Sequence, residues 1–197
     1  GGGLYADYGC APLIQDTTFE NNRAGQGGGM FAYFSSAQFQ IERCAFLSNA
    51  ATRPNADGGG ALWNGSNQDV LVTHTRFIAN VAVGSNGGAI ANWNTEPHDL
   101  LLLNCLFARN LAGADGGAVS NSWSSRLTMI NCTLGANAAP RGDGGGLSDG
   151  GYDITSLTNC VFWANSDSGG TDETAQISWD PSDKKAINYG CVQGWTG

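Results

Sequence analysis

The sequence has little charge and a composition that disfavours long surface helices. Charged residues make up 13% of the 197 residues, whereas glycine accounts for 30 of them. Surface helices need charged faces and tolerate glycine poorly, so a helical bundle is disfavoured. The 41% of hydrophobic residues can form a core, which argues against a disordered chain. A folded β protein with many glycine turns is expected.

Basic clusters and long apolar runs are also absent. Nine Lys and Arg stand against 17 Asp and Glu, for a net charge of −8, so nucleic acid is not an expected partner. The longest apolar run is the short stretch 100–103, so no membrane insertion of this segment is expected. The sequence begins Gly-Gly-Gly-Leu without Met or an export signal, and we expect it to be a fragment of a longer chain.

A repeat of about 28 residues is present along most of the chain. One block consists of two small residues, usually glycine, and a hydrophobic residue; it occurs at 2–4, 28–30, 60–62, 88–90, 117–119 and 145–147. A second block, Phe-x-x-Asn or Leu-x-x-Asn, alternates with it and begins at Phe19, Phe46, Phe77, Phe107, Leu134 and Phe162. Strict alternation of two independent blocks predicts a solenoid.

Alternating apolar residues within each repeat indicate three short strands. Apolar residues stand five and seven positions before the Phe of the second block, as Ile41 and Phe39 do before Phe46. Another inward position lies two before that Phe, so the spacing changes from even to odd and the chain must bend in between. Polar residues mark this corner: Arg43, His74, Asn104, Asn131 and Asn159.

Three short strands cannot enclose a core alone, but stacked coils can. We expect an all-β parallel β-helix of six to seven coils of about 28 residues, with like residues in ladders, as a single domain over 1–197. The coils are regular over 1–165, and an atypical terminal coil covers 166–197. The Asn of the second block is expected at a turn, where its amide bonds to its own backbone and to the Asn of adjacent coils.

The alternation of Phe-x-x-Asn with Gly-Gly-Ala-Ile resembles the right-handed parallel β-helix repeats of polymorphic outer membrane proteins and autotransporter-type adhesins. The resemblance covers residues 1 to about 165. It implies a right-handed β-helix, an extracellular or cell-surface location and a longer parent chain. It implies no catalytic residues.

Six cysteines do not show disulfide spacing. Cys44, Cys105, Cys132, Cys160 and Cys191 are expected to share one inward position, with Cys10 outside it. Stacked side chains about 4.8 Å apart exceed the usual Cβ separation of a disulfide, so a ladder of buried free thiols is favoured over a disulfide framework. The sequence contains no Cys-x-x-Cys pair, so a metal site formed by cysteines is not indicated.

Acidic residues before the glycine blocks raise the question of a cation. Stacked Asp115 and Asp143 with nearby carbonyl oxygens are candidate Ca²⁺ ligands. The favoured interpretation is that both residues form Asx turns that lead into the glycine bend, with no cofactor bound.

Aromatic residues outside the core positions are the main candidates for ligand binding. Tyr33, Trp63, Trp93, Trp123 and Tyr152 follow the glycine blocks and are expected to line one edge of the rod. Aromatic rings beside polar groups suit polysaccharide or cell-surface glycan. Packing of these rings over the corner of a coil, or against another subunit, is the alternative.

Catalytic candidates are few. Glu96, His98 and Asp99 fall in one loop between coils, which is more typical of solvated surface. We therefore expect a non-catalytic extracellular structural or adhesive module that contacts glycans or self-associates through its coil ends. A polysaccharide lyase or glycoside hydrolase of β-helix type, or its carbohydrate-binding part, is the alternative.

Overall fold

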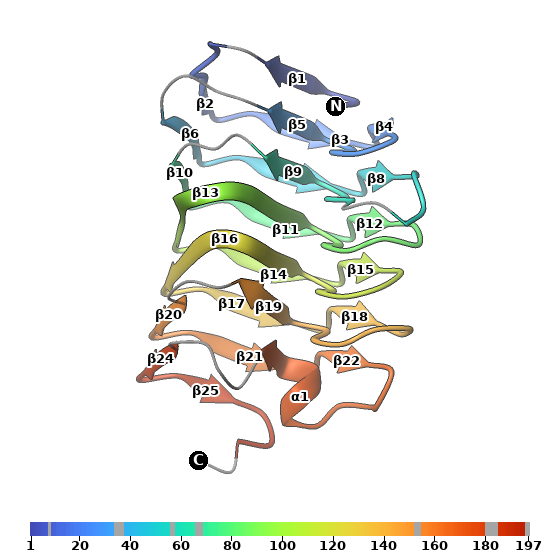
Figure 1. Ribbon diagram of the computed structural model, residues 1–197, viewed down its shortest axis with the longest axis vertical. Helices are drawn as coiled ribbons and strands as arrows, with labels where there is room; N and C mark the ends of the chain where they lie inside the picture. Colours follow the sequence, from blue (N-terminus) through green and yellow to red (C-terminus); the bar gives the residue numbers. More distant parts are fainter. Residues whose placement is uncertain are drawn as a thin grey trace.

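Short parallel strands wind around one axis in successive coils (Figure 1). The computed structural model describes residues 1–7, 9–33, 38–55, 58–65, 69–151, 155–179 and 185–195. Three parallel sheets, called here A, B and C, run the length of the rod. Sheet B has seven strands, one for each passage of the chain, so the expected number of coils is confirmed. The all-β parallel β-helix predicted by the repeat is the observed fold.

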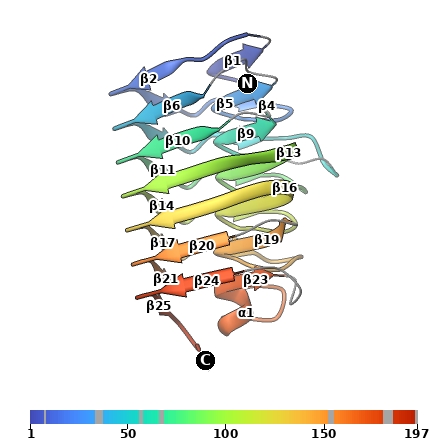
Figure 2. The same ribbon diagram turned by 60° about the vertical axis from the view of Figure 1, so that its left-hand side comes forward.

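Sheet A contains two strands of each coil. Those that follow the glycine blocks are β1 (Leu4–Asp7), β5 (Met30–Tyr33), β9 (Leu62–Gly65), β19 (Leu147–Gly151) and β23 (Ile177–Trp179). The next strand of each coil is β2 (Leu13–Gln15), β6 (Phe39–Glu42), β10 (Val70–Thr73), β20 (Thr155–Thr158) or β24 (Lys185–Asn188). In two coils the pair is one long bent strand, β13 (Ile90–Leu103) or β16 (Val119–Ile130) (Figure 2).

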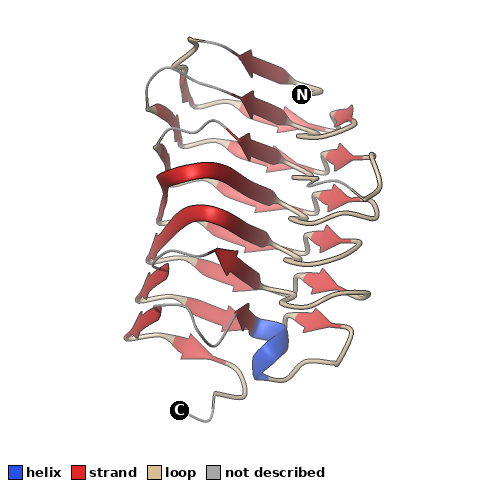
Figure 3. Cartoon of the chain, viewed as in Figure 1, coloured by secondary structure: helices blue, strands red, loops and turns tan. Residues whose placement is uncertain are grey.

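Sheets B and C complete each coil. Sheet B consists of β3 (Thr18–Glu20), β7 (Ala45–Leu47), β11 (Arg76–Ile78), β14 (Leu106–Ala108), β17 (Thr133–Gly135), β21 (Val161–Trp163) and β25 (Cys191–Val192). Sheet C consists of two-residue strands β4 (Arg23–Ala24), β8 (Ala50–Ala51), β12 (Val81–Ala82), β15 (Leu111–Ala112), β18 (Ala138–Ala139) and β22 (Ser166–Asp167). The three expected strands are therefore joined by a fourth, which the sequence pattern did not indicate. Figure 3 shows how strands dominate the chain.

Like residues stack in the core as expected. The ring of Phe77 lies between those of Phe46 and Phe107, with centroids 5.0 and 4.8 Å away and the planes within 10° of parallel. All three rings are fully buried. Parallel register places each Phe opposite the next, so the ladder follows directly from the repeat.

The polar corner residues adopt the left-handed backbone conformation that the odd spacing requires. Their φ angles lie between 49° and 55° at Asp16, Arg43, His74, Asn104, Asn131, Asn159 and Tyr189. A single left-handed residue turns the chain from sheet A into sheet B while both flanking strands keep one face inward. Asn and Asp tolerate this conformation better than most residues, which explains their frequency here.

The glycine blocks are needed for close backbone approach. Gly87 has φ 68°, and a Cβ on Gly88 would collide with the carbonyl oxygen of Gly117 and lie 2.6 Å from the carbonyl carbon of Leu111. The chain of one coil therefore touches the next at a point where only glycine fits.

The Asn of the second block forms a buried ladder. Asn110 donates from Nδ2 to Oδ1 of Asn137 and to the carbonyl oxygen of Phe77, both at 2.9 Å. Its own Oδ1 accepts from the backbone N–H and the Nδ2 of Asn80. The expected bond between adjacent Asn residues is confirmed. The backbone partners belong to adjacent coils, however, rather than to the residue itself.

Four cysteines occupy the inward position next to the corner, and a fifth does not. Cys105, Cys132 and Cys160 are buried free thiols, as is Cys44. Each Sγ lies 3.2 to 3.4 Å from the carbonyl oxygen two residues earlier, where Thr75 Oγ1 makes the same bond. Cys191 pairs with Val161 and is exposed, so its assignment to this position was wrong by one residue.

The end of the regular coils is marked by a short helix, α1 (Glu173–Gln176). Gln176 lies where the next Asn of the ladder would lie, and its Oε1 accepts from the backbone N–H and the Nδ2 of Asn165. Asp172 caps the helix by accepting from the N–H groups of Thr174 and Ala175. The helix thus ends the buried amide ladder with a matching side chain.

Candidate functional site

The predicted aromatic residues fall into two groups instead of one row. Tyr33 and Trp63 lie near the start of sheet A, on β5 and β9, while Trp93 and Trp123 lie on β13 and β16. Tyr152 lies outside the described residues. The first group is an internal stack: Trp63 lies 4.5 Å from Phe31 with the rings 8° from parallel, and Tyr33 is tilted against it.

Trp63 has little free ring surface. It is 5% exposed, and its indole lies over Gly65, where a Cβ would collide with the ring. The expected edge position is therefore wrong in detail for Trp63, because a glycine two residues later lets the ring fold down onto the sheet. Its neighbour Tyr5, which stacks on Phe31, is 58% exposed.

Trp123 has an accessible ring. It is 52% exposed and has φ 62°, at the bend of strand β16. The ring of Trp93 meets it at 66° with centroids 5.7 Å apart, so one indole supports the other edge to face. Of the described aromatic candidates, Trp123 has the most exposed side chain.

The three catalytic candidates lie on the same bent part of sheet A. Glu96, His98 and Asp99 are all within strand β13, so the expectation of a loop was wrong at this point. The register between β13 and β16 shifts between Asn94 and His98, because β13 carries the longer connection across the bend. Glu96 is exposed, and His98 is half-buried.

Charged residues of neighbouring coils pair with these candidates. Arg126 Nε donates to Asp99 Oδ1 at 2.6 Å. Asp69 Oδ1 accepts from the backbone N–H of Asp99 at 3.0 Å and lies 3.6 Å from His98 Nδ1. The side chains of Asp99 and Arg126 are 51% and 40% exposed, so these pairs are solvated. They fix side-chain positions more than they stabilise the fold.

Asp69 and Arg126 were not singled out from the sequence. Both occupy the position before the first apolar residue of the second strand, as Asp99 does. Alignment of the repeats on that first apolar residue would have shown that Asp69, Asp99 and Arg126 occupy equivalent positions. We call the outer face formed by Trp93, His98, Asp99, Trp123 and Arg126 the bend surface.

Asp115 and Asp143 form part of a hydrogen-bonded column. Asp115 Oδ1 accepts from the backbone N–H of Asp143 at 3.0 Å, and Asn86 Oδ1 accepts from that of Asp115. The side chains of Asn86 and Asp115 thus each accept a hydrogen bond from the backbone of the next coil. Among the described residues, no group of three or more His, Cys, Asp or Glu is placed to hold a metal ion.

The sequence of this chain matches the model of a known protein family. A family model described as a right handed beta helix region matches residues 1–178. The chain belongs to this β-helix family. No curated protein and no solved structure matched the chain. In the part of the chain that the structure describes, no helix is long and apolar enough to span a membrane.

Proposed function

We propose that this chain is a non-catalytic β-helix module of an extracellular or cell-surface protein, and that it contacts glycans through the bend surface. The β-helix supplies a rigid row of strands, and the bend surface adds the functional groups. Sugar rings offer an apolar face for stacking and hydroxyl groups for hydrogen bonds. An indole beside carboxylate and guanidinium groups matches both requirements.

The observation that supports this proposal is the exposed, edge-supported ring of Trp123. Arg126 follows it by three residues on β16, and Arg126 holds Asp99 of the preceding coil. The bend surface therefore combines one aromatic plane with fixed donors and acceptors. Fixed side chains lower the entropy cost of binding a flexible oligosaccharide.

The proposal is tested by screening the protein against immobilised neutral and acidic glycans and repeating any binding with Trp123→Ala. Loss of the stacking ring is expected to weaken binding about tenfold or more, since truncation of a residue that dominates a binding site costs about 2 kcal/mol or more. The matched control is Trp163→Ala, because Trp163 is 54% exposed on sheet B, away from the bend. Equal loss in both variants, or binding unaffected by Trp123→Ala, would contradict the proposal.

One observation favours the enzymatic alternative. His98 and Asp69 lie beside the Asp99–Arg126 pair, and such groups are able to transfer protons. Incubation with uronate-containing and neutral polysaccharides would reveal new reducing or unsaturated ends if this cluster were catalytic. Product that disappears in Asp99→Asn would replace the module proposal with an enzyme.

A further inference from the structure

A polar groove lies at the corner between sheets A and B, away from the bend surface. Its volume is about 370 Å³. Residues of the first four coils line it, including Asp16, Thr18, Arg43, Ala45, His74 and Arg76. The floor of the groove is low because the small side chain of Ala45 lies between those of Thr18 and Arg76 on the outer face of sheet B. The groove thus combines a small apolar floor with charged walls.

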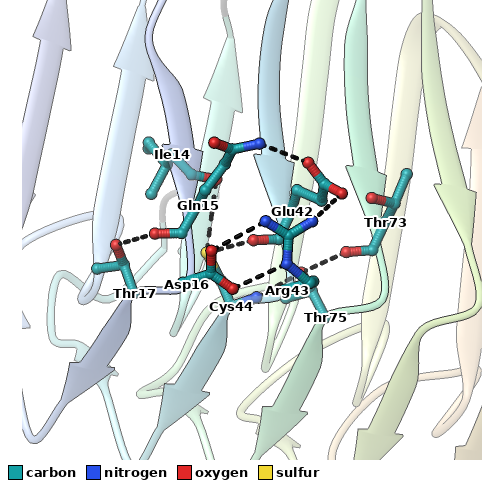
Figure 4. Close-up of polar contacts among 9 residues, drawn as sticks. All are labelled: Ile14, Gln15, Asp16, Thr17, Glu42, Arg43, Cys44, Thr73 and Thr75. Carbon is teal, nitrogen blue, oxygen red and sulfur yellow. Dashed lines mark hydrogen bonds and ion pairs between the residues drawn. The ribbon is translucent and has the colours of Figure 1, made fainter.

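The guanidinium of Arg43, on one wall, is already engaged by two carboxylates. Arg43 donates from Nε and Nη2 to the two carboxylate oxygens of Asp16, at 2.8 and 2.9 Å, and contacts Glu42 through Nη1 (Figure 4). Gln15 Nε2 donates to the other oxygen of Glu42 at 2.6 Å. The hydrogen bond from Arg43 holds the pKa of Asp16 below its usual range. Both carboxylates are therefore already partnered.

Arg76 on the opposite wall is different. Its guanidinium has no hydrogen bond or ion pair with any described residue, and the side chain is exposed. Other exposed arginines such as Arg109 also lack a carboxylate partner among the described residues, but Arg76 lines the groove. Its planar donors match a carboxylate in bidentate geometry.

The row of amides beside the groove assigns the tautomer of His74. Asn159 donates from Nδ2 to Oδ1 of Asn131, and Asn131 donates to Oδ1 of Asn104. Asn104 therefore directs its Nδ2 toward His74 Nε2, 3.2 Å away, and that nitrogen must accept. The proton of neutral His74 then sits on Nδ1, which bonds to no described residue. His74 adds a second unused donor to the groove.

From these observations we propose that the groove binds the carboxylate group of an organic ligand, with Arg76 and His74 as donors. The one unpaired positive charge of Arg76 suits a single negative charge better than a phosphate dianion, because Asp16 and Glu42 lie close by. The side chains of Ala45 and Leu106 offer an apolar surface for the body of the ligand. This site goes beyond the proposed glycan contact and uses none of its residues.

The test is a titration of the ¹⁵N-labelled protein with glucuronate, N-acetylglycine, glucose and inorganic phosphate, followed by NMR. Saturable shifts of the Ala45, Arg76 and Asn104 amides with either carboxylate support the proposal, and the tighter of the two indicates a sugar-acid or a peptide source. Arg76→Gln is expected to weaken this binding at least about tenfold, because a charge-assisted hydrogen bond is lost. Arg109→Gln, an equal change of charge at an exposed residue outside the groove, should leave the affinity unchanged.

A second variant pair tests the role of His74. Asn at this position would continue the amide row and direct an N–H toward the groove, so His74→Asn should retain the carboxylate affinity within about threefold, whereas His74→Ala should lose it. The proposal is overturned if glucose or phosphate produces the same shifts at equal concentration, if no saturation occurs, or if Arg76→Gln binds like the original protein. Trp123→Ala should not alter this titration, which separates its outcome from that of the glycan proposal.

Discussion

Asn110 and Asn137 lie on adjacent coils, and the 2.9 Å bond from Nδ2 of the first to Oδ1 of the second is fully buried. The same Oδ1 accepts the backbone N–H of Asn110. One amide thus satisfies both a side chain and the backbone of its neighbour. Buried polar groups that lose such partners keep the full cost of their desolvation.

Removal of one amide from this ladder is therefore expected to destabilise the protein strongly. Asn110→Ala removes the side-chain acceptor of the Asn80 N–H, one of the two acceptors of Asn80 Nδ2, and a donor to the carbonyl oxygen of Phe77. We expect a loss of about 3 kcal/mol in the free energy of unfolding, measured by urea denaturation. Asn131→Ala, in the exposed amide row, should cost less, about 1 to 2 kcal/mol, chiefly because Ala tolerates the left-handed conformation of this position less well than Asn. Equal losses would show that burial of the ladder does not matter.

Close coil-to-coil contact at the glycine blocks leads to a second prediction. Gly88→Ala places a methyl group against the backbone of Gly117 and Leu111, which cannot yield as a side chain can. We expect a loss of about 4 kcal/mol or failure to fold, seen by circular dichroism and thermal melting. Gly135→Ala is the control, since a Cβ there has only Trp163 O at 3.7 Å and the preceding coil already has Ala108 at this place. That variant should be as stable as the original, or more so.

The sequence predicted the ladders well because every coil repeats the same environment. The residue types at Phe77, Gly88 and Asn110 recur at equivalent positions of successive coils. Because the coils pair in parallel and in register, these like residues come into contact. The odd spacing before the corner correctly predicted a bend there, and the structure shows that one left-handed residue makes it.

The candidate site was harder to predict, since it lies where the coils differ in length. Leu100 lies ten positions after Ile90, but Leu127 lies only eight positions after Val119, so the register shifts across the bend. Pairs such as Asp99 with Arg126 cannot be found until that shift is known. The burial of Trp63 likewise depends on Gly65, a local exception to the repeat.

Thiol labelling tests the cysteine ladder. All six cysteines are free, but Cys10 and Cys191 are exposed while the other four are buried. A thiol reagent at neutral pH should react rapidly with two thiols of the native protein and with six after denaturation. A count of four or fewer under denaturing conditions would indicate a disulfide. Rapid reaction of all six in the native state would contradict the burial of the ladder.

The buried thiols should also make stability depend on alkaline pH. The hydrogen bond with Cys105, together with burial, raises the pKa of Cys132 to about 12, and the bond with Cys132 raises the pKa of Cys160 further, while that of Cys105 is lowered. Well below about pH 8.5, the pKa of an unperturbed thiol, Cys132 and Cys160 are protonated in both the folded and the unfolded state. Above it the unfolded chain releases protons that Cys132 and Cys160 retain, so the unfolded state binds fewer protons and stability falls as pH rises.

The slope of that fall identifies the thiols as its source. Well above pH 9 the Cys105 thiol is ionised in both states and contributes nothing, whereas Cys132 and Cys160 keep two protons that the unfolded chain has lost. Stability should therefore fall by about 2.7 kcal/mol per pH unit up to the pKa of Cys132 near 12. Burial also raises the pKa of the Cys44 thiol, which adds to the fall. Other groups titrate in this range, so the comparison is with a Cys132→Thr, Cys160→Thr variant. Thr75 already occupies the equivalent position, bonded to the carbonyl oxygen of Thr73, so the fold should accept both substitutions. Urea unfolding at pH 8, 9, 10 and 11 should show a shallower decline in the variant; parallel declines would mean that the thiols do not control alkaline stability.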